Sequence, residues 1–464
     1  MAYRSLLRVP GAGFFPLGFL ARLPYATSSL ATLVLVRAAF GSYAFAGLAA
    51  AAQGIANALG RVREVPPASR RPARTLAAPP ESPSTPSTRT SGRHADRTHR
   101  TPRGPPSGRT TGLRGHDLGS PVAGALADCY GHRLVGALCA LANAGALTGL
   151  VVASHTGRPS TIAAAALAGL TQPPVGSLVR VHWSRLLRAR ERTDLVPTAL
   201  SYEASVDEIS FVAGPALVGL LTALGPTAPT LAAVALLLLA TLPFALSLAP
   251  GRTAPRPVPG TSRTPLPRLP LAVMFLAMAA MGTVFGAVQT GVTAYAEARG
   301  HPGGAGLLYA LFGVGSALAG AACAWLPARF TPHHRYVTFA ATLLLGTLVL
   351  LAGYDLHAVP AAMAVAGVTV APYMISLYAL TERLAPADRA TAALTILCAG
   401  GPLGTATGQA LSGHLADRHG PAGAFLPAPL AAGAALLLAV TVVLADRRRT
   451  SRPGPTTERD ATGG

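Results

Sequence analysis

Four ionisable side chains stand inside long apolar stretches, where they could bind a proton, an ion or a polar molecule. Arg22 has thirteen uncharged residues before it and fourteen after it. Glu203, Asp207 and Glu208 occupy the first half of another apolar stretch. An ionised group at the centre of a bilayer costs about 2.5–3.5 kcal/mol on insertion scales, so these four groups need partners.

The positions of these residues along two expected helices predict which of them meet. In helices at 14–36 and 197–222 that run in the same direction, Arg22 is the ninth residue, and Glu203 and Asp207 are the seventh and eleventh. With a rise of about 1.5 Å per residue, Arg22 lies at a depth between the two carboxylates, which share one helix face. We therefore predict that Arg22 contacts Glu203 or Asp207 within about 4 Å.

Three roles stay open for this cluster. Three acids against one arginine leave a surplus carboxylate that could carry a proton. The cluster could instead be a static set of ion pairs that fixes helix packing, or it could contact a transported substrate.

The apolar stretches themselves predict an all-α membrane protein with twelve transmembrane helices. Only 12% of the residues are charged and 50% are hydrophobic, and about 20 apolar residues of helix cross a bilayer. Buried helices of a large soluble protein would need polar faces, which these stretches lack. The expected spans are residues 14–36, 42–60, 134–154, 160–179, 197–222, 229–249, 269–293, 304–326, 336–354, 359–381, 389–411 and 422–445.

The arginines predict how the chain is oriented in the membrane. All 38 basic residues are arginine, and with an inside N-terminus 33 of them fall on inside segments. Four fall on outside connections, namely Arg37, Arg158, Arg299 and Arg418. This excess predicts a multi-pass protein of a cell membrane (inner or plasma membrane) with both termini cytoplasmic. The net charge of +20 thus reflects orientation, and we expect no nucleic-acid partner. Arginine without lysine, beside abundant Ala, Gly and Pro, is typical of a high-GC bacterium such as an actinobacterium.

Two halves of the sequence resemble each other. The Ala-Gly-Leu of residues 46–48 recurs at 305–307, and the Gly-Pro of 214–215 recurs at 401–402. We expect a pseudo-two-fold axis along the membrane normal that relates spans 1–6 to spans 7–12, in two six-helix bundles. Such repeats are typical of transporters, whose sites lie between the repeats.

Residues 61–119 interrupt the repeat and differ from the rest of the chain. Of these 59 residues, 42 are Arg, Pro, Thr, Ser or Gly, a composition that predicts disorder. His94, Asp96 and His99 have the spacing of metal ligands, but in such a polar tract we expect no metal site. The expected organisation is an N-terminal half (1–249) with a disordered cytoplasmic insert (61–119), a central cytoplasmic linker (250–268), a C-terminal half (269–446) and a disordered cytoplasmic tail (447–464).

The segment from Gly124 through Asp128 and Gly131 to Arg133 resembles the signature of the major facilitator superfamily of transporters. In that family the signature lies between spans two and three, and the resemblance covers nearly the whole chain apart from the insert and the tail. It implies that spans one and five are neighbours. It also implies that Asp128 caps a helix end and pairs with the C-terminal half, as part of a conformational switch. Cys129 stands where a basic residue is usual, which weakens this charge relay.

Two further segments resemble motifs of the same family. Residues 210–219, with Gly214, Pro215 and Gly219, resemble its antiporter motif, although Ser210 and Val218 depart from it. Glycine and proline also serve general helix packing, so both interpretations stay open. Residues 413–420 repeat the Gly-x-Leu-Ala-Asp-x-x-Gly pattern after span eleven. The expected topology puts this copy outside, where it cannot do the work of Asp128.

Polar side chains elsewhere in the spans could line a midplane cavity or join helices by hydrogen bonds. They are Gln53, Asn57, Gln172, Gln289, Thr290, Tyr309, Tyr373 and Gln409.

No motif of a hydrolase, metalloprotease or ATP site is present. The four cysteines have no C-x-x-C spacing. We therefore expect no enzyme activity, no metal and no cofactor. The sequence predicts export of a small amphipathic molecule by a monomeric, proton-coupled antiporter in the lipid bilayer. The alternatives are an uptake carrier for a metabolite and a non-transporting membrane protein inactivated by its insert.

Overall fold

The computed structural model describes residues 14–62, 132–248, 266–327, 330–355, 358–386 and 389–450, and these residues contain helices but no β-strand. The N-terminal half comprises α2 (Phe14–Leu20), α3 (Leu23–Phe40), α4 (Tyr43–Val62), α6 (His132–Thr156), α7 (Arg158–Leu170), α8 (Val175–Ala189), η1 (Thr193–Leu195), α9 (Val196–Thr222), α10 (Ala228–Leu236), the π-helical turn η2 (Leu237–Thr241) and α11 (Leu242–Ser247). The C-terminal half comprises α12 (Arg268–Ala298), α13 (Gly304–Ala322), η3 (Cys323–Trp325), α14 (Pro332–Asp355), α15 (Val359–Val368), α16 (Val370–Leu384), α17 (Ala390–Phe425) and α18 (Pro427–Thr450).

These helices build twelve spans, as the sequence predicts. Ten helical segments among the described residues are long and apolar enough to cross a membrane. The other two spans are α4 and α17, which are rich in alanine and glycine and pack against each other. Many large apolar side chains outside the core are exposed, including Leu224, Leu239 and Leu430. Such a surface suits hydrocarbon rather than water.

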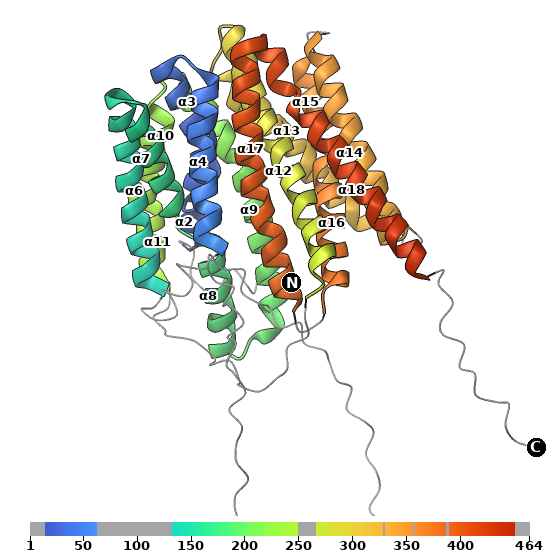
Figure 1. Ribbon diagram of the computed structural model, residues 1–464. Coiled ribbons are helices and arrows are strands. Elements are labelled where there is room, and N and C mark those ends of the chain that lie inside the picture. Colours follow the sequence, from blue (N-terminus) through green and yellow to red (C-terminus); the bar gives the residue numbers. More distant parts are fainter. Residues whose placement is uncertain are drawn as a thin grey trace, which may run out of the picture. The chain divides into compact units, whose positions relative to one another are not determined.

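The two halves have equivalent helix packing, which confirms the predicted equivalence of spans two and eight. Span two (α4) packs against span eleven (α17), and span eight (α13) packs against span five (α9), so exchanging the halves exchanges the two contacts. The contact of span three with span six recurs as that of span nine with span twelve. Figure 1 shows α4 beside α17. We call these contacts between the halves the α4–α17 seam and the α9–α13 seam.

Glycine lets the backbones approach closely along both seams. A Cβ atom added at Gly47 of α4 would lie 2.2 Å from the Gln409 carbonyl oxygen of α17. One added at Gly306 of α13 would lie 2.0 Å from the Pro215 carbonyl oxygen of α9. Because neither position has room for a side chain, small residues are what hold the halves together here.

Several spans are interrupted, which apolar length alone does not predict. Span one breaks between α2 and α3, span four breaks between α7 and α8, and span six contains η2. Span four therefore continues to Ala189 instead of ending at residue 179. The helix α17, which contains span eleven, continues past residue 411 and breaks at Gly420, whose φ of 71° is suited to glycine at a helix C-terminus.

Parts of the predicted organisation lie outside the described residues. These are residues 63–119 of the insert, most of the linker at 250–268, and residues 451–464 of the tail. The tail's first four residues, 447–450, belong to α18.

Candidate functional site

A break in span one positions Arg22. Residues 21 and 22 form a turn between α2 and α3, and Pro24, which has no backbone N–H, stands in the first turn of α3. The Arg22 guanidinium folds back so that Nη1 donates to the Gly18 carbonyl oxygen at 2.9 Å. This bond places a positive charge at the C-terminal end of α2, where the helix dipole favours it.

Arg22 pairs with two carboxylates of α9, as the sequence predicts. Its Nε donates to Asp207 Oδ1 at 2.7 Å, and its Nη2 donates to Glu203 Oε2. Glu203 also accepts a hydrogen bond from the indole Nε1 of Trp183 on α8. Arg22 and Glu203 are 6% and 1% exposed. A buried ion pair needs such additional hydrogen bonds to offset the desolvation of both charges.

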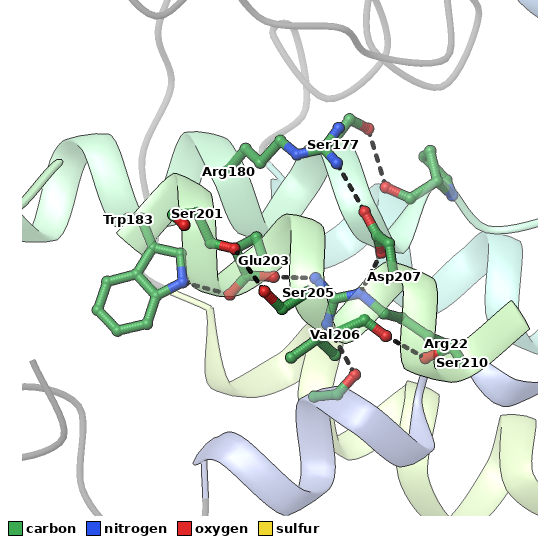
Figure 2. A network of polar contacts seen from close by, with 12 residues as sticks. Arg22, Ser177, Arg180, Trp183, Ser201, Glu203, Ser205, Val206, Asp207 and Ser210 are labelled. Atoms are coloured by element: carbon green, nitrogen blue, oxygen red, sulfur yellow. Dashed lines mark hydrogen bonds and ion pairs between the residues drawn. The ribbon is translucent and has the colours of Figure 1, made fainter. Parts of the chain in front are cut away.

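A second arginine, Arg180 of α8, also pairs with Asp207. Its Nη2 donates to Asp207 Oδ2 at 2.6 Å, so Asp207 is shared between two guanidinium groups (Figure 2). The predicted surplus of carboxylates over a single arginine is therefore wrong for this cluster, which contains two arginines and two acids. The physical reason is that α8 restarts after Pro173 and Pro174 and carries Arg180 into the span, instead of leaving it in a loop.

Glu208 does not join the cluster. It is exposed on α9, and no hydrogen bond or ion pair links it to Arg22 among the described residues. It lies four residues before Val212, which packs against Gly313 of α13. Its side chain therefore leaves α9 on the side of the C-terminal half.

A cavity of about 180 Å³ opens beside Asp207 and Arg180. Arg22 and the break before α8 form part of its wall, and Tyr25 and Phe211 supply an aromatic surface, with ring centroids 6.0 Å apart. Asp207 and Arg180 are 26% and 31% exposed, much more than Arg22 and Glu203. Of the four charged groups in this cluster, Asp207 and Arg180 are thus the two that can change partners.

A second polar cluster joins the halves near their centre. Gln409 Nε2 of α17 donates to Ser29 Oγ of α3 at 2.6 Å and to Gln289 Oε1 of α12 at 2.8 Å. The hydroxyl of Tyr309 contacts the side chain of Gln289. Three of the predicted cavity residues, Gln289, Tyr309 and Gln409, are thus brought together.

The remaining predicted cavity residues lie elsewhere. Gln53 is buried on α4 and donates to Ser28 Oγ, and Asn57 lies about one turn further along. Gln172 lies in the break between α7 and α8. Thr290 Oγ1 donates to a carbonyl oxygen of its own helix. Tyr373 is buried in the core of the C-terminal half, where its hydroxyl donates to the Ala277 carbonyl oxygen at 3.2 Å.

The two family-like motifs have different outcomes. Gly214 packs against Ala26 of α3, whereas Pro215 and Gly219 pack against α13 across the seam. These contacts agree with a packing role for this motif, and its role as an antiporter motif stays a prediction. In the other motif, Arg133 is exposed in the first turn of α6. Gly124, Asp128 and Gly131 lie outside the described residues, so the predicted switch around Asp128 stays a prediction.

The copy of that motif after span eleven fastens the halves at one end of the bundle. Asp417 accepts hydrogen bonds from the Ser42 hydroxyl at 2.6 Å and from the backbone N–H groups of Tyr43 and Ala44 at 2.8 and 3.0 Å. Beside it, Arg37 of α3 pairs with Glu297 of α12 at 2.9 Å. We call this end, where α3 ends and α4 begins, the α3–α4 end. The 18 residues of α3 separate Arg22 from this end, so the ion cluster lies roughly 27 Å along the helix from it.

Comparison with known sequences decides the family. The sequence model of the Major Facilitator Superfamily matches residues 118–362 and, in an overlapping second match, residues 274–462. The chain belongs to the major facilitator superfamily. No curated protein matches the chain closely.

Several solved transporter structures have the same fold. The nucleoside transporter NupG is similar over 93% of this chain and 99% of its own, with a TM-score of 0.64 and 15% identity. The human organic anion transporter MFSD10 (TETRAN) is similar over 93% and 98%, with a TM-score of 0.56 and 16% identity. The POT family transporter PepTSo is similar over 95% and 99%, with a TM-score of 0.59 and 10% identity. At these identities the likeness concerns the fold alone.

Proposed function

We propose that this member of the major facilitator superfamily is a proton-coupled secondary transporter that moves a small molecule by alternating access. The observation that carries the proposal is the placement of Asp207, an ionisable carboxylate that lines a cavity and is shared by two arginines. In transporters, binding sites form where spanning helices are interrupted, and here spans one and four are interrupted at the cavity wall.

Alternating access also requires that the halves separate at one end while they close at the other. The Asp417 and Arg37–Glu297 contacts supply a closure at the α3–α4 end. Hydrogen bonds and an ion pair between polar groups can break and reform, unlike the glycine packing deeper in the seams.

The direction of transport follows from how the substrate and the proton interact at Asp207. A substrate that competes with the proton is exported against an inward proton gradient, which is the direction expected from the sequence. A substrate that binds together with the proton is taken up. The two arginines beside Asp207 favour uptake, because they repel cations that would compete with the proton.

The experiment measures transport of small molecules, tested as a panel of compounds, into proteoliposomes with an imposed proton gradient. We expect a gradient-dependent flux in the wild type, and in Asp207→Asn an exchange of substrate that no longer responds to the gradient. Asp194→Asn, the same change at an exposed position of η1, is the matched control and should behave like the wild type. Gradient-driven accumulation by Asp207→Asn equal to that of the wild type would contradict proton coupling at this residue. The absence of any flux or exchange would favour the non-transporting alternative.

A further inference from the structure

We propose that the cavity beside Asp207 binds a small organic carboxylate together with one proton, and that Arg180 is the residue that recognises the carboxylate. This inference rests on the proposed function and adds the chemical class of the substrate. It also assigns a role to Arg180, which the predicted span boundaries place in a loop.

The charge balance at the cavity favours an anion that arrives with a proton. Arg22 and Arg180 neutralise Glu203 and Asp207. A cation would add a positive charge next to two guanidinium groups, and an anion alone would add a negative charge next to two carboxylates. When Asp207 is protonated, the cluster carries one net positive charge, which a carboxylate then neutralises.

The geometry indicates which arginine becomes available. A proton on Asp207 Oδ2 removes the negative charge that holds Arg180 and turns the acceptor of its Nη2 into a donor. Arg22 keeps Glu203 and the Gly18 carbonyl as partners, and it is almost fully buried. Among the described residues, the carboxylate that pairs with Arg180 is that of Asp207, and Arg180 lines the cavity. Once Asp207 is protonated, the planar guanidinium of Arg180 can bind a substrate carboxylate with two parallel hydrogen bonds.

The other groups around Asp207 do not take over its role. Glu203 is bound to Arg22 and Trp183 and is 1% exposed. Glu208 is the neighbouring acid on α9, and it does not line the cavity. Tyr25 of α3 lines the cavity, and His182 of α8 stacks on Phe14 of α2, away from it. The helices α10 and α13, which also pack against α9, carry no charged side chain.

The cavity's size and its aromatic wall narrow the substrate further. At about 180 Å³ it is smaller than the ~300–1,000 Å³ of drug-sized sites. Tyr25 and Phe211 offer ring surface to the apolar part of a ligand whose carboxylate reaches Arg180. A compact aromatic or short aliphatic acid fits both features.

The test measures binding and proton uptake with purified protein at equilibrium, without transport. The probes are benzoate, its neutral and cationic counterparts benzamide and benzylamine, and butyrate as an aliphatic acid. Calorimetric titration in two buffers of different ionisation enthalpy counts the protons bound with each ligand. We expect an acid to bind with uptake of about one proton. We expect benzamide to bind at least about tenfold more weakly than benzoate, because it makes no charge-assisted hydrogen bond, and benzylamine not to bind.

Three variants separate the roles of the residues. Arg180→Gln should weaken binding of the acid at least about tenfold, because it removes the charged hydrogen-bond partner of the carboxylate. Asp207→Asn should still bind the acid but without proton uptake, because its side chain is always neutral. Arg188→Gln, an exposed position of α8 outside the cavity wall, is the matched control and should bind like the wild type. Thermal unfolding shows whether each variant is folded. If Arg180→Gln alone is unfolded, the charge-balanced double variant with Asp207→Asn replaces it, and loss of acid binding there supports the proposal.

Four results would overturn the proposal: tighter binding of benzylamine than of benzoate, failure of both acids to bind, acid binding without proton uptake, or unchanged acid binding in a folded Arg180→Gln variant. These results are distinct from failure of the proposed function. A protein that binds acid with a proton yet moves nothing in proteoliposomes would contradict transport, whereas proton-driven transport of an amine would contradict only the substrate class.

Discussion

The Asp417 carboxylate of α17 accepts a 2.6 Å hydrogen bond from the hydroxyl of Ser42, the residue that precedes α4 in the opposite half. Ser42 in turn accepts a hydrogen bond from the backbone N–H of Phe45, while Asp417 accepts those of Tyr43 and Ala44. The first backbone N–H groups of a helix have no partner within the helix, and a negative charge there is also favoured by the helix dipole. One half thus caps a helix of the other, and this end can open only if the cap is lost.

We predict that Asp417→Asn favours opening of the α3–α4 end. The amide keeps one acceptor oxygen but loses the charge and the second acceptor, and loss of an N-cap costs about 0.5–2 kcal/mol. A cysteine at the buried Ala416, in a background without the native cysteines, should react faster with a maleimide when Asp417 is replaced.

Arg418→Gln is the control for this change, because it removes a charge from an exposed neighbour without touching the cap. It should leave the labelling rate at the wild-type value. An equal rate in the Asp417→Asn and wild-type backgrounds would mean that the cap does not hold this end closed.

The cap should also weaken in acid. Asp417 follows the predicted span 389–411. Partial burial raises its pKa, but hydrogen bonds from the Ser42 hydroxyl and two backbone N–H groups outweigh this effect, so the pKa lies below its ordinary value. A carboxyl group whose pKa is lowered by folding stabilises the protein above the unfolded pKa of about 3.9, and this stabilisation disappears as the pH falls through the folded pKa. The difference in melting temperature between wild type and Asp417→Asn should be constant from pH 7 to about 5 and shrink below about 4. A difference independent of pH down to 3 would exclude the charged cap.

Hydropathy and helix depth predicted the contact of Arg22 with the α9 acids, because a charge in hydrocarbon needs a partner and a helix has a fixed rise. They did not predict Arg180, since apolar length cannot reveal that a helix restarts after Pro173-Pro174 and continues past the hydrophobic window. The role of Asp417 was missed for another reason. Its partners include backbone N–H groups of a distant helix. Every residue except proline has such a group, so the sequence does not show which of them Asp417 contacts. Tyr373 has the polarity expected of a cavity residue, yet one carbonyl oxygen satisfies its hydroxyl inside the core.

Replacing Arg22 should destabilise the protein mainly through the acid that remains. Among the described residues, Arg22→Leu leaves the buried Glu203 with the Trp183 indole as its hydrogen-bond donor. Breaking a buried ion pair in this way costs about 3–5 kcal/mol. The double variant Arg22→Leu with Glu203→Gln removes that stranded charge. It should therefore be less destabilised than the sum of the two single variants. Thermal or denaturant unfolding in detergent measures all four proteins, and additive effects would mean that the two side chains do not interact. We also expect Arg22→Leu to abolish transport.

In the α9–α13 seam the two helix backbones approach each other closely at Gly306. A Cβ atom at Gly306 would lie 2.0 Å from the Pro215 carbonyl oxygen and 2.4 Å from the Gly219 nitrogen. Both are backbone atoms, which cannot rotate aside, so the helices themselves must move apart. Gly306→Ala should therefore destabilise the protein by about 1–3 kcal/mol, the usual cost of overpacking.

Gly149→Ala on α6 is the matched control, because nothing lies within 4 Å of its added Cβ. There alanine should be neutral or stabilise the helix by about 0.5–1 kcal/mol. Melting temperatures in detergent compare the two variants, and transport in proteoliposomes should be lost in Gly306→Ala alone, because a spread seam cannot close. Equal stability and equal transport of the two variants would show that the halves do not need this close contact.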